Sequence, residues 1–391
     1  MKLNIFKSLA VVALLALLTV GVSEPVYAQK AKKEKAKTEK AKKEKVTDPR
    51  LLTVMKMTKM TKESQFLTKG VALKTAHRAT QGFSISADEA TMWFSQPGSI
   101  GKNQPGLTKV HENYIVRRQD GKRETMTLRY FGNANALAVE HAEDGKDYIW
   151  IGSNGTKYKG AYGRTRTVSR FPFEVNGEIN DGYAGENFYM GGERYCYPAV
   201  NVAADILGIV TQKAGAVTVN LYNLSDARAM DDSEIKIKTQ YKGEVVGEPE
   251  QTVVRTIKAK DMTTMEAISS FTIPKPDKES ADPAKEVNYY TFRAWDVDKD
   301  YVYFVEGQHN KGSMKNGESK AFITVYDHAG RIVLPKRRIQ CIFDQYLLES
   351  LQITPAGYAD IAGIKVIDSK IYVMFSVKNS KGFRTVVVKY E

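Results

Sequence analysis

The chain has 391 residues, of which 58 are Lys or Arg and 45 are Asp or Glu, so its formal net charge is +13. It is long enough to bury a large core, and two cysteines are too few for that core to depend on disulfides. Much of the excess charge lies in one N-terminal run and no nucleic-acid-reading motif follows, so we exclude nucleic acid as a partner.

Residues 1–28 have the pattern of a secretory signal peptide. Lys2 and Lys7 precede an apolar run at 9–22, and residues 26–28 end in the small residue expected before a cleavage site. The apolar run is shorter than the roughly 20 residues that a membrane span needs, and no later stretch is apolar enough. We therefore predict an exported protein, periplasmic or extracellular, with no transmembrane segment after cleavage.

Residues 29–50 are predicted to form a flexible tether. Residues 31–45 comprise three five-residue units, AKKEK, AKTEK and AKKEK, and the run from Gln29 to Lys45 holds nine Lys and three Glu, a net charge of +6. Such a charged run has too few apolar side chains to form a core. Two interpretations stay open: a spacer that keeps the domain clear of the membrane, or attachment to an anionic envelope surface.

Residues 51–391 are predicted to form one all-β domain after a weakly patterned lead-in at 46–70. A hairpin of a short apolar strand, a polar turn and an aromatic strand recurs at 83–94, 137–150 and 292–304, and more loosely at 364–373. Each aromatic strand can be covered by the neighbouring copy, which is typical of radially repeated sheets. Inner strands starting near Phe83, Leu137, Val200, Phe292 and either Leu351 or Ile364 predict a five-bladed β-propeller; six blades would leave each unit short.

Three further features refine this prediction. The charged segment at about 228–287 is predicted to be an insertion that contains a hairpin around Lys242-Gly243. Residues 261–271 are predicted to form one short helix. The last strand, at 385–390, is predicted to close the ring by pairing with a strand near the start of the domain, where residues 66–74 favour a strand.

The sequence resembles the helveticin J-like family in three places: His77 with Gln81-Gly82-Phe83, the run 126–132, and 138–140 followed by 148–150. These proteins are secreted bacterial five-bladed β-propellers related to a large bacteriocin. The resemblance covers mainly residues 74–153 and implies a propeller in the cell envelope or medium. Family members usually carry a histidine where Asn133 stands in this chain, so a role tied to that histidine is not carried over.

The loops that enter the inner strands of a propeller converge on its axis, so we predict a ligand site there. Aromatic faces can stack on sugar rings, and amide, carboxylate and guanidinium groups can bond hydroxyls or anionic substituents. The alternatives are loop side chains bonded to backbone and tyrosines packed between blades; a hydrolase pair of Glu186 and Glu193 is a weaker reading. The predicted ligand-binding residues are His77, Arg78, Gln81, Asn133, Asn135, Glu186, Arg194 and Tyr195.

We predict no metal and no cofactor. The run from Asp296 to Asp300 resembles the start of a calcium loop, but Tyr301 stands where that loop needs glycine, so it is interpreted as a hairpin turn. Neither Cys196 nor Cys341 has a second ligand at zinc spacing. Whether the two cysteines form a disulfide stays open.

These observations favour an exported, non-enzymatic β-propeller that binds an envelope or extracellular ligand, in particular a glycan or another anionic surface, at its axial face. Two alternatives from other classes remain. One is a bacteriocin-like antagonistic toxin, and the other is a propeller hydrolase that acts on a polysaccharide or a lactone.

Overall fold

The computed structural model describes residues 46–98, 112–132, 135–158, 161–213, 216–241, 251–273, 291–308, 319–342, 345–352 and 358–391. The predicted signal peptide, the tether up to Lys45 and Asn133 lie outside these residues. The contacts divide the chain into Met1–Val46 and Thr47–Glu391. All the strands and helices described here belong to the second unit.

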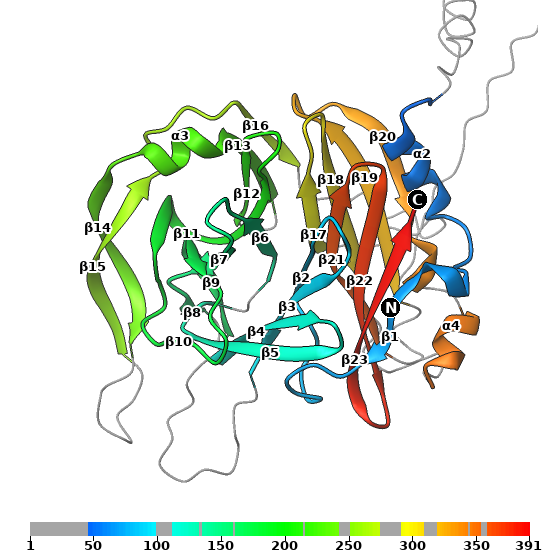
Figure 1. The fold of residues 1–391 in the computed structure, drawn as a ribbon. Coiled ribbons are helices and arrows are strands. Elements are labelled where there is room, and N and C mark those ends of the chain that lie inside the picture. The colour runs from blue at the N-terminus through cyan, green and yellow to red at the C-terminus, as the bar shows by residue number, and fades with distance from the viewer. Residues whose placement is uncertain are drawn as a thin grey trace, which may run out of the picture. The chain divides into compact units, whose positions relative to one another are not determined.

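The predicted all-β class is confirmed (Figure 1). Helix is limited in the described residues to the short α2 (Pro49–Lys56), α3 (Leu224–Ala229) and α4 (Gln345–Ser350), with 3-10 turns at Glu63–Gln65 and Gln340–Ile342. The strands form antiparallel sheets in which neighbours along the chain are mostly neighbours in the sheet.

The sheet nearest the amino terminus of the unit runs in the order β2 (Gly82–Ile85), β3 (Thr91–Pro97), β4 (Glu112–Gln119) and β5 (Lys122–Arg129), with β10 (Glu178–Ile179) added in parallel. The next runs β6 (Leu137–His141), β7 (Asp147–Ser153), β9 (Ala161–Pro172) and the first part of β11 (Glu186–Asn201). A short strand, β8 (Thr156–Tyr158), pairs with β9.

Strand β11 belongs to two sheets. Its residues 186–189 pair with β9, whereas residues 195–201 pair with β12 (Ile206–Lys213), which continues into β13 (Ala216–Asn223) and β16 (Ser269–Ile273). The strands β14 (Asp232–Tyr241) and β15 (Gln251–Asp261) are antiparallel, and β15 joins the outer side of β11. Residues 242–243, around which a hairpin was predicted, lie outside the described residues.

Two four-stranded sheets complete the unit. One runs β17 (Thr291–Val297), β18 (Tyr301–Gln308), β19 (Lys320–Asp327) and β20 (Ile332–Arg338). The other runs β21 (Ala359–Ile367), β22 (Lys370–Asn379), β23 (Gly382–Tyr390) and β1 (Phe66–Val71). The antiparallel pairing of β1 with β23 confirms the predicted pairing of the last strand with one near the start of the domain.

The first strand of each sheet lies against the first strand of the next. The contacts run from β2 to β6, from β6 to β11, from β11 to β17, from β17 to β21, and from β21 back to β2. Hydrophobic clusters fill the spaces between neighbouring sheets. One joins Trp93 to Ile149, another joins Trp150 to Leu207, a third joins Trp295 to Val210, and a fourth joins Phe83 to Tyr372.

The structure corrects two predictions. Residues 261–271 do not form a helix: a turn follows Asp261, and the chain then enters β16, whose backbone pairs with the edge strand β13. The third inner strand ends, rather than starts, near Val200. In addition, the weakly patterned lead-in contains α2, so the predicted tether boundary at residue 50 falls inside a helix. Cys196 and Cys341 are both buried and do not form a disulfide with each other.

Two glycines allow aromatic rings to bridge neighbouring sheets. A Cβ at Gly208 in β12 would collide with the ring of Trp295 in β17, and a Cβ at Gly363 in β21 would collide with Phe83 in β2. Trp295 is also fixed by a hydrogen bond of 3.1 Å from its Nε1 to the carbonyl of Tyr197. These contacts therefore leave no room for a larger residue.

We predict that Gly208→Ala lowers the free energy of unfolding by about 1–3 kcal/mol, because the added methyl overfills a packed contact. Urea denaturation measures this. The control is Val254→Ala at a side chain that is 64% exposed, which should change stability by less than about 0.5 kcal/mol. Equal stabilities of Gly208→Ala and the wild type would contradict the packing described here.

Candidate functional site

A cavity of about 860 Å³ lies where the carboxyl ends of the inner strands meet. Strands β2, β6, β11 and β21 contribute to it, the turn after β17 supplies Asp298 and Lys299, and the start of α2 supplies a further wall. Since segments far apart in sequence supply its walls, this is the candidate functional site. The cavity is lined by Asp48, Pro49, Arg50, Ile85, Ala87, Val139, His141, Val200, Asn201, Val202, Ala203, Ala204, Ile206, Asp298, Lys299, Lys365, Val366, Ile367, Asp368 and Ser369.

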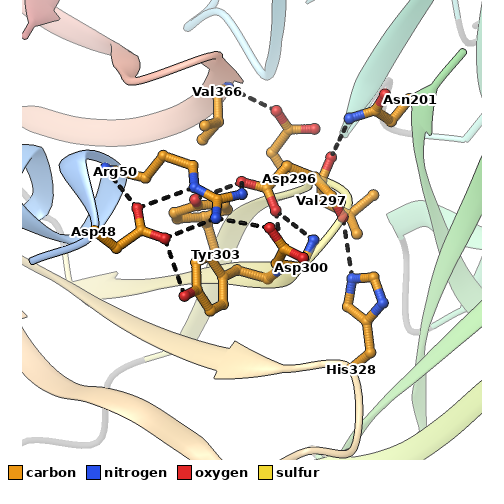
Figure 2. A network of polar contacts seen from close by, with 11 residues as sticks. Asp48, Arg50, Asn201, Asp296, Val297, Asp300, Tyr303, His328 and Val366 are labelled. Atoms are coloured by element: carbon orange, nitrogen blue, oxygen red, sulfur yellow. Dashed lines mark hydrogen bonds and ion pairs between the residues drawn. The ribbon is translucent and has the colours of Figure 1, made fainter. Parts of the chain in front are cut away.

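One side of the cavity is built around Arg50, which three carboxylates surround (Figure 2). The guanidinium lies 2.7 Å from Asp48, 3.0 Å from Asp298 and 2.7 Å from Asp300. It also covers the ring of Tyr301 at 4.5 Å, a favourable cation–π distance. Arg50 therefore joins the first turn of α2 to the turn between β17 and β18.

Local backbone bonds explain why these carboxylates meet. Asp48 caps α2, because its side chain accepts a hydrogen bond of 2.8 Å from the backbone N–H of Arg50. Asp298 holds the β17–β18 turn by accepting from the backbone N–H groups of Asp300 and Tyr301, both at 2.8 Å. The interpretation of residues 296–300 as a hairpin turn is confirmed.

The Arg50 guanidinium changes the acidity of its neighbour. Its hydrogen bond lowers the pKa of Asp48 from 3.8 to about 2. Asp48 is therefore ionised throughout the physiological range. It cannot act as a proton donor near neutral pH.

A buried ion pair lies behind a second side of the cavity. The Nζ of Lys365 is 3.2 Å from Asp296 and 3.3 Å from the carbonyl oxygen of Val200, and the other Asp296 oxygen accepts from the backbone N–H of Val366 at 2.7 Å. Burial raises the pKa of Asp296, and the Lys365 charge opposes that rise. Lys365 thus links β11, β17 and β21 beside the cavity.

His141 forms a third polar side. Its Nδ1 lies 2.7 Å from Asp147, which also pairs with Arg117 at 3.2 Å, and its ring lies 5.1 Å from that of Trp93. The carboxylate fixes the orientation of the imidazole and leaves Nε2 on the other side of the ring. A second histidine belongs to the network around Arg50: His328 lies 3.0 Å from the carbonyl oxygen of Asp298 (Figure 2).

Of the predicted ligand residues that the structure describes, none lines this cavity. His77 and Arg78 are exposed in the segment before β2, and Gln81 directly precedes β2. Asn135 precedes β6, and Tyr195 is the first β11 residue paired with β12. These positions are at the amino ends of the inner strands, whereas the cavity is at their carboxyl ends. Asn133 lies outside the described residues.

Glu186 is separated from the other predicted residues. Glu186 of β11 is paired with Arg170 of β9, and Arg170 is paired with Trp150 of β7. Trp150 is paired in turn with Ala138 of the inner strand β6. Three strand spacings of about 4.8 Å place Glu186 roughly 14 Å from that strand. Its carboxylate pairs with Arg170 at 2.9 Å and with Arg228 at 3.4 Å. A ligand role for Glu186 would have to break these pairs.

The aromatic residues near Tyr195 are packed against one another. Its ring is stacked on Tyr197, with centroids 6.2 Å apart, and Tyr197 lies 4.9 Å from Phe292. Asn135 bonds the hydroxyl of Tyr197, whose pKa burial raises. Arg194, next to Tyr195, is half-buried. The ligand roles of the predicted residues therefore stay predictions.

Sequence reasoning missed the residues of the cavity. Asp48, Pro49 and Arg50 fell within the predicted tether, and the inner strands were considered only at their amino ends. The acidic run 296–300 was the available signal, because three carboxylates so close together need a cation. Only the fold identifies the cations: Arg50, about 250 positions earlier in the chain, for Asp298 and Asp300, and Lys365 for Asp296.

The described residues contain no group of three or more His, Cys, Asp or Glu side chains placed to hold a metal ion. In the same part of the chain, no helix has both the length and the apolar character to cross a membrane. Burial raises the pKa of the Cys196 thiol to about 11, so this cysteine is not a reactive nucleophile.

Comparisons with known proteins found no matching family model and no matching curated protein. Among solved structures, a tail fiber of Staphylococcus aureus phage P68 aligns with 83% of this chain and 52% of its own, at 10% identity and a TM-score of 0.49. Two structures described as glycoside hydrolases align with 83% and 88% of this chain and with 61% and 96% of their own. Their identities are 11% and 9%, and their TM-scores are 0.31 and 0.33.

This chain thus spans between about half and three fifths of the length of the first two of these structures. Likenesses at such identities and TM-scores do not indicate a function.

We predict that Arg50→Gln destabilises the protein by about 1–3 kcal/mol, because three carboxylates lose their charged partner. Chemical denaturation at neutral pH measures this. The control is Arg331→Gln, which removes an ion pair with Asp327 from a side chain that is 82% exposed. It should cost less than about 1 kcal/mol.

The free energy of unfolding of the wild type and that of Arg50→Gln should depend differently on pH. The pKa of Asp48 is lower in the folded protein than the ordinary 3.8, so its stabilising contribution is complete above 3.8 and is lost as the pH falls towards about 2. The stability difference between the wild type and Arg50→Gln should therefore narrow over that interval. A difference that stays constant down to pH 2 would show that the Arg50–Asp48 pair does not contribute.

Proposed function

We propose that this chain is a five-bladed β-propeller that binds a glycan in the cavity at the carboxyl ends of its inner strands, without chemical turnover. The propeller is supported by the cyclic contacts of β2, β6, β11, β17 and β21 and by the pairing of β1 with β23. The cavity is the observation that carries the function. Its volume of about 860 Å³ falls within the roughly 300–1,000 Å³ of small-molecule sites.

The lining favours a ligand with both hydroxyl groups and aliphatic faces. Asp368 supplies hydrogen-bond acceptors and Lys299 supplies donors. Asn201 and Ser369 each supply both a donor and an acceptor. Val139 and Val366 are among the aliphatic side chains that line the same space. A pyranose ring presents these two kinds of surface together, which supports a glycan as the ligand class.

The state of the carboxylates supports binding over hydrolysis. A glycosidase needs one carboxyl group that gives up a proton and a second that stays ionised. Asp48 and Asp298 are both held by Arg50, and the pKa of Asp48 is lowered to about 2. Asp48 cannot serve as the acid, and Asp298 is engaged by backbone and tyrosine donors.

We also propose that the protein acts outside the cytoplasm, on the basis of residues 1–28, and that it is related to the helveticin J-like proteins, on the basis of residues 74–153. The alternative of a bacteriocin-like toxin can be distinguished from a glycan receptor by experiment. It predicts that the purified protein inhibits the growth of related strains, whereas a glycan receptor alone does not.

The test is binding to an array of immobilised glycans, followed by titration calorimetry with the best soluble binder. We predict that Ser369→Trp at the cavity lowers the affinity at least tenfold, because the indole occupies ligand space. The control is Val175→Trp, at a side chain that is 49% exposed and lies outside the cavity, which should bind like the wild type.

Three results would overturn the proposal. Silence of the whole array would exclude a glycan among the tested structures as the ligand. Unchanged affinity in Ser369→Trp would place the site elsewhere, with the amino ends of the inner strands as the next region to test. Release of a shortened product during incubation would show that the protein is a hydrolase.

A further inference from the structure

Helix α2 has an outward surface that combines apolar and basic side chains. Leu52 and Met55, one turn apart, are each 39% exposed, and Met60 beyond the helix is 54% exposed. Lys56 and Lys59 are exposed on the same segment. The opposite side of the helix packs into the domain through Leu51, Val54 and Met57, which are at most 5% exposed. We call Leu52, Met55, Lys56, Lys59 and Met60 the α2 face.

The α2 face is held in a fixed orientation. Arg50 fixes the start of the helix through its three carboxylates, and Lys56 donates to the carbonyl oxygen of Glu391 at 2.6 Å. At the other end, the backbone N–H of Gln340 donates to the carbonyl oxygen of Met57 at 2.8 Å. Because the helix backbone is already anchored, binding a partner through this surface requires little further ordering of the backbone.

The α2 face itself carries basic charge. Residues 51–62 contain Lys56, Lys59 and Lys62 but no Asp or Glu, whereas the charge of Arg50 is already compensated by its three carboxylates. Strand β20 contacts α2 (Figure 1) and adds exposed Arg338, two residues before Gln340. In the sequence, the segment is preceded by the run 29–45 with its net charge of +6. A partner of the α2 face is therefore expected to be anionic.

We propose that the α2 face docks on the surface of a phospholipid bilayer with anionic headgroups. Leu52, Met55 and Met60 would enter the boundary between headgroups and acyl chains, while the lysines and Arg338 would lie among the headgroup phosphates. Stable attachment to a membrane combines two signals, and this chain supplies an apolar patch together with basic charge. An anionic polysaccharide would satisfy the lysines but would leave the apolar side chains in water.

This surface is separate from the cavity of the proposed function, since none of its residues lines that cavity. Membrane docking through the α2 face therefore does not depend on whether the cavity binds a glycan. A protein bound through the α2 face would carry its ligand site on a membrane surface without a spanning segment.

The test is co-sedimentation of residues 29–391 with vesicles of phosphatidylcholine alone or mixed with phosphatidylglycerol. We predict binding to the mixed vesicles that weakens about tenfold in the Leu52→Ser, Met55→Ser double variant, because the apolar contribution is lost. Arg338→Ser should weaken binding about fivefold, the effect of one basic residue at an anionic surface. The matched control is Val254→Ser with Ile268→Ser, two side chains that are 64% and 53% exposed away from α2.

A second measurement separates lipid from polyanion. Binding to immobilised long-chain polyphosphate should be the same for the wild type and the Leu52→Ser, Met55→Ser variant, because it depends on charge alone. Unfolding midpoints of all variants verify that they are folded. If the double variant binds the mixed vesicles as tightly as the wild type, the attachment is purely electrostatic and the proposed docking mode is wrong.

Discussion

The constraint on which this structure depends is that both faces of most of its sheets are apolar. Trp93 and Phe94, adjacent in β3, point to opposite faces of one strand and belong to two different hydrophobic clusters. A single sheet cannot bury both faces, and a pair of sheets leaves two uncovered. A cyclic series of sheets removes every such face from water, and the contacts of the inner strands follow that cycle.

The same cycle determines where chemistry can occur. It brings together segments that the sequence separates by hundreds of residues, and their charges must then be compensated at close range. Arg50 neutralises part of an acidic turn, and Lys365 does the same for buried Asp296. The side chains left at the cavity rim, such as Lys299 and Asp368, are exposed and available to a ligand. The residues that stabilise the site thus differ from those that remain exposed at the cavity.

The hairpins were predictable because their signals are local: polar turns between short apolar and aromatic strands decide pairing within about 20 residues. The β1–β23 pairing was predictable because residues 66–74 favour a strand with no local partner. Helix α2 was missed because its buried stripe has only three apolar residues, Leu51, Val54 and Met57, among lysines. The sharing of β11 between two sheets depends on a shift of its pairing between Tyr189 and Arg194, which no local pattern encodes.

The site was harder to predict than the fold for a specific reason. Sequence can identify both ends of an inner strand, but packing decides which end remains open. At the amino ends, Tyr197 and Phe292 pack together, whereas at the carboxyl ends small residues such as Ala87 and Ala203 leave space. The cavity therefore depends on side-chain volumes summed over strands that are distant in the sequence.

The pairing of β1 with β23 has a consequence for how the chain reaches its native state. The two partners are separated by more than 300 residues, so β1 is synthesised long before the strand that will cover its edge exists. Until then the growing polypeptide carries an unsatisfied strand edge and an open series of sheets, both of which invite association with other chains. A product truncated before residue 382 would keep those edges permanently, and cellular quality control would treat it as misfolded although most of its hairpins could form.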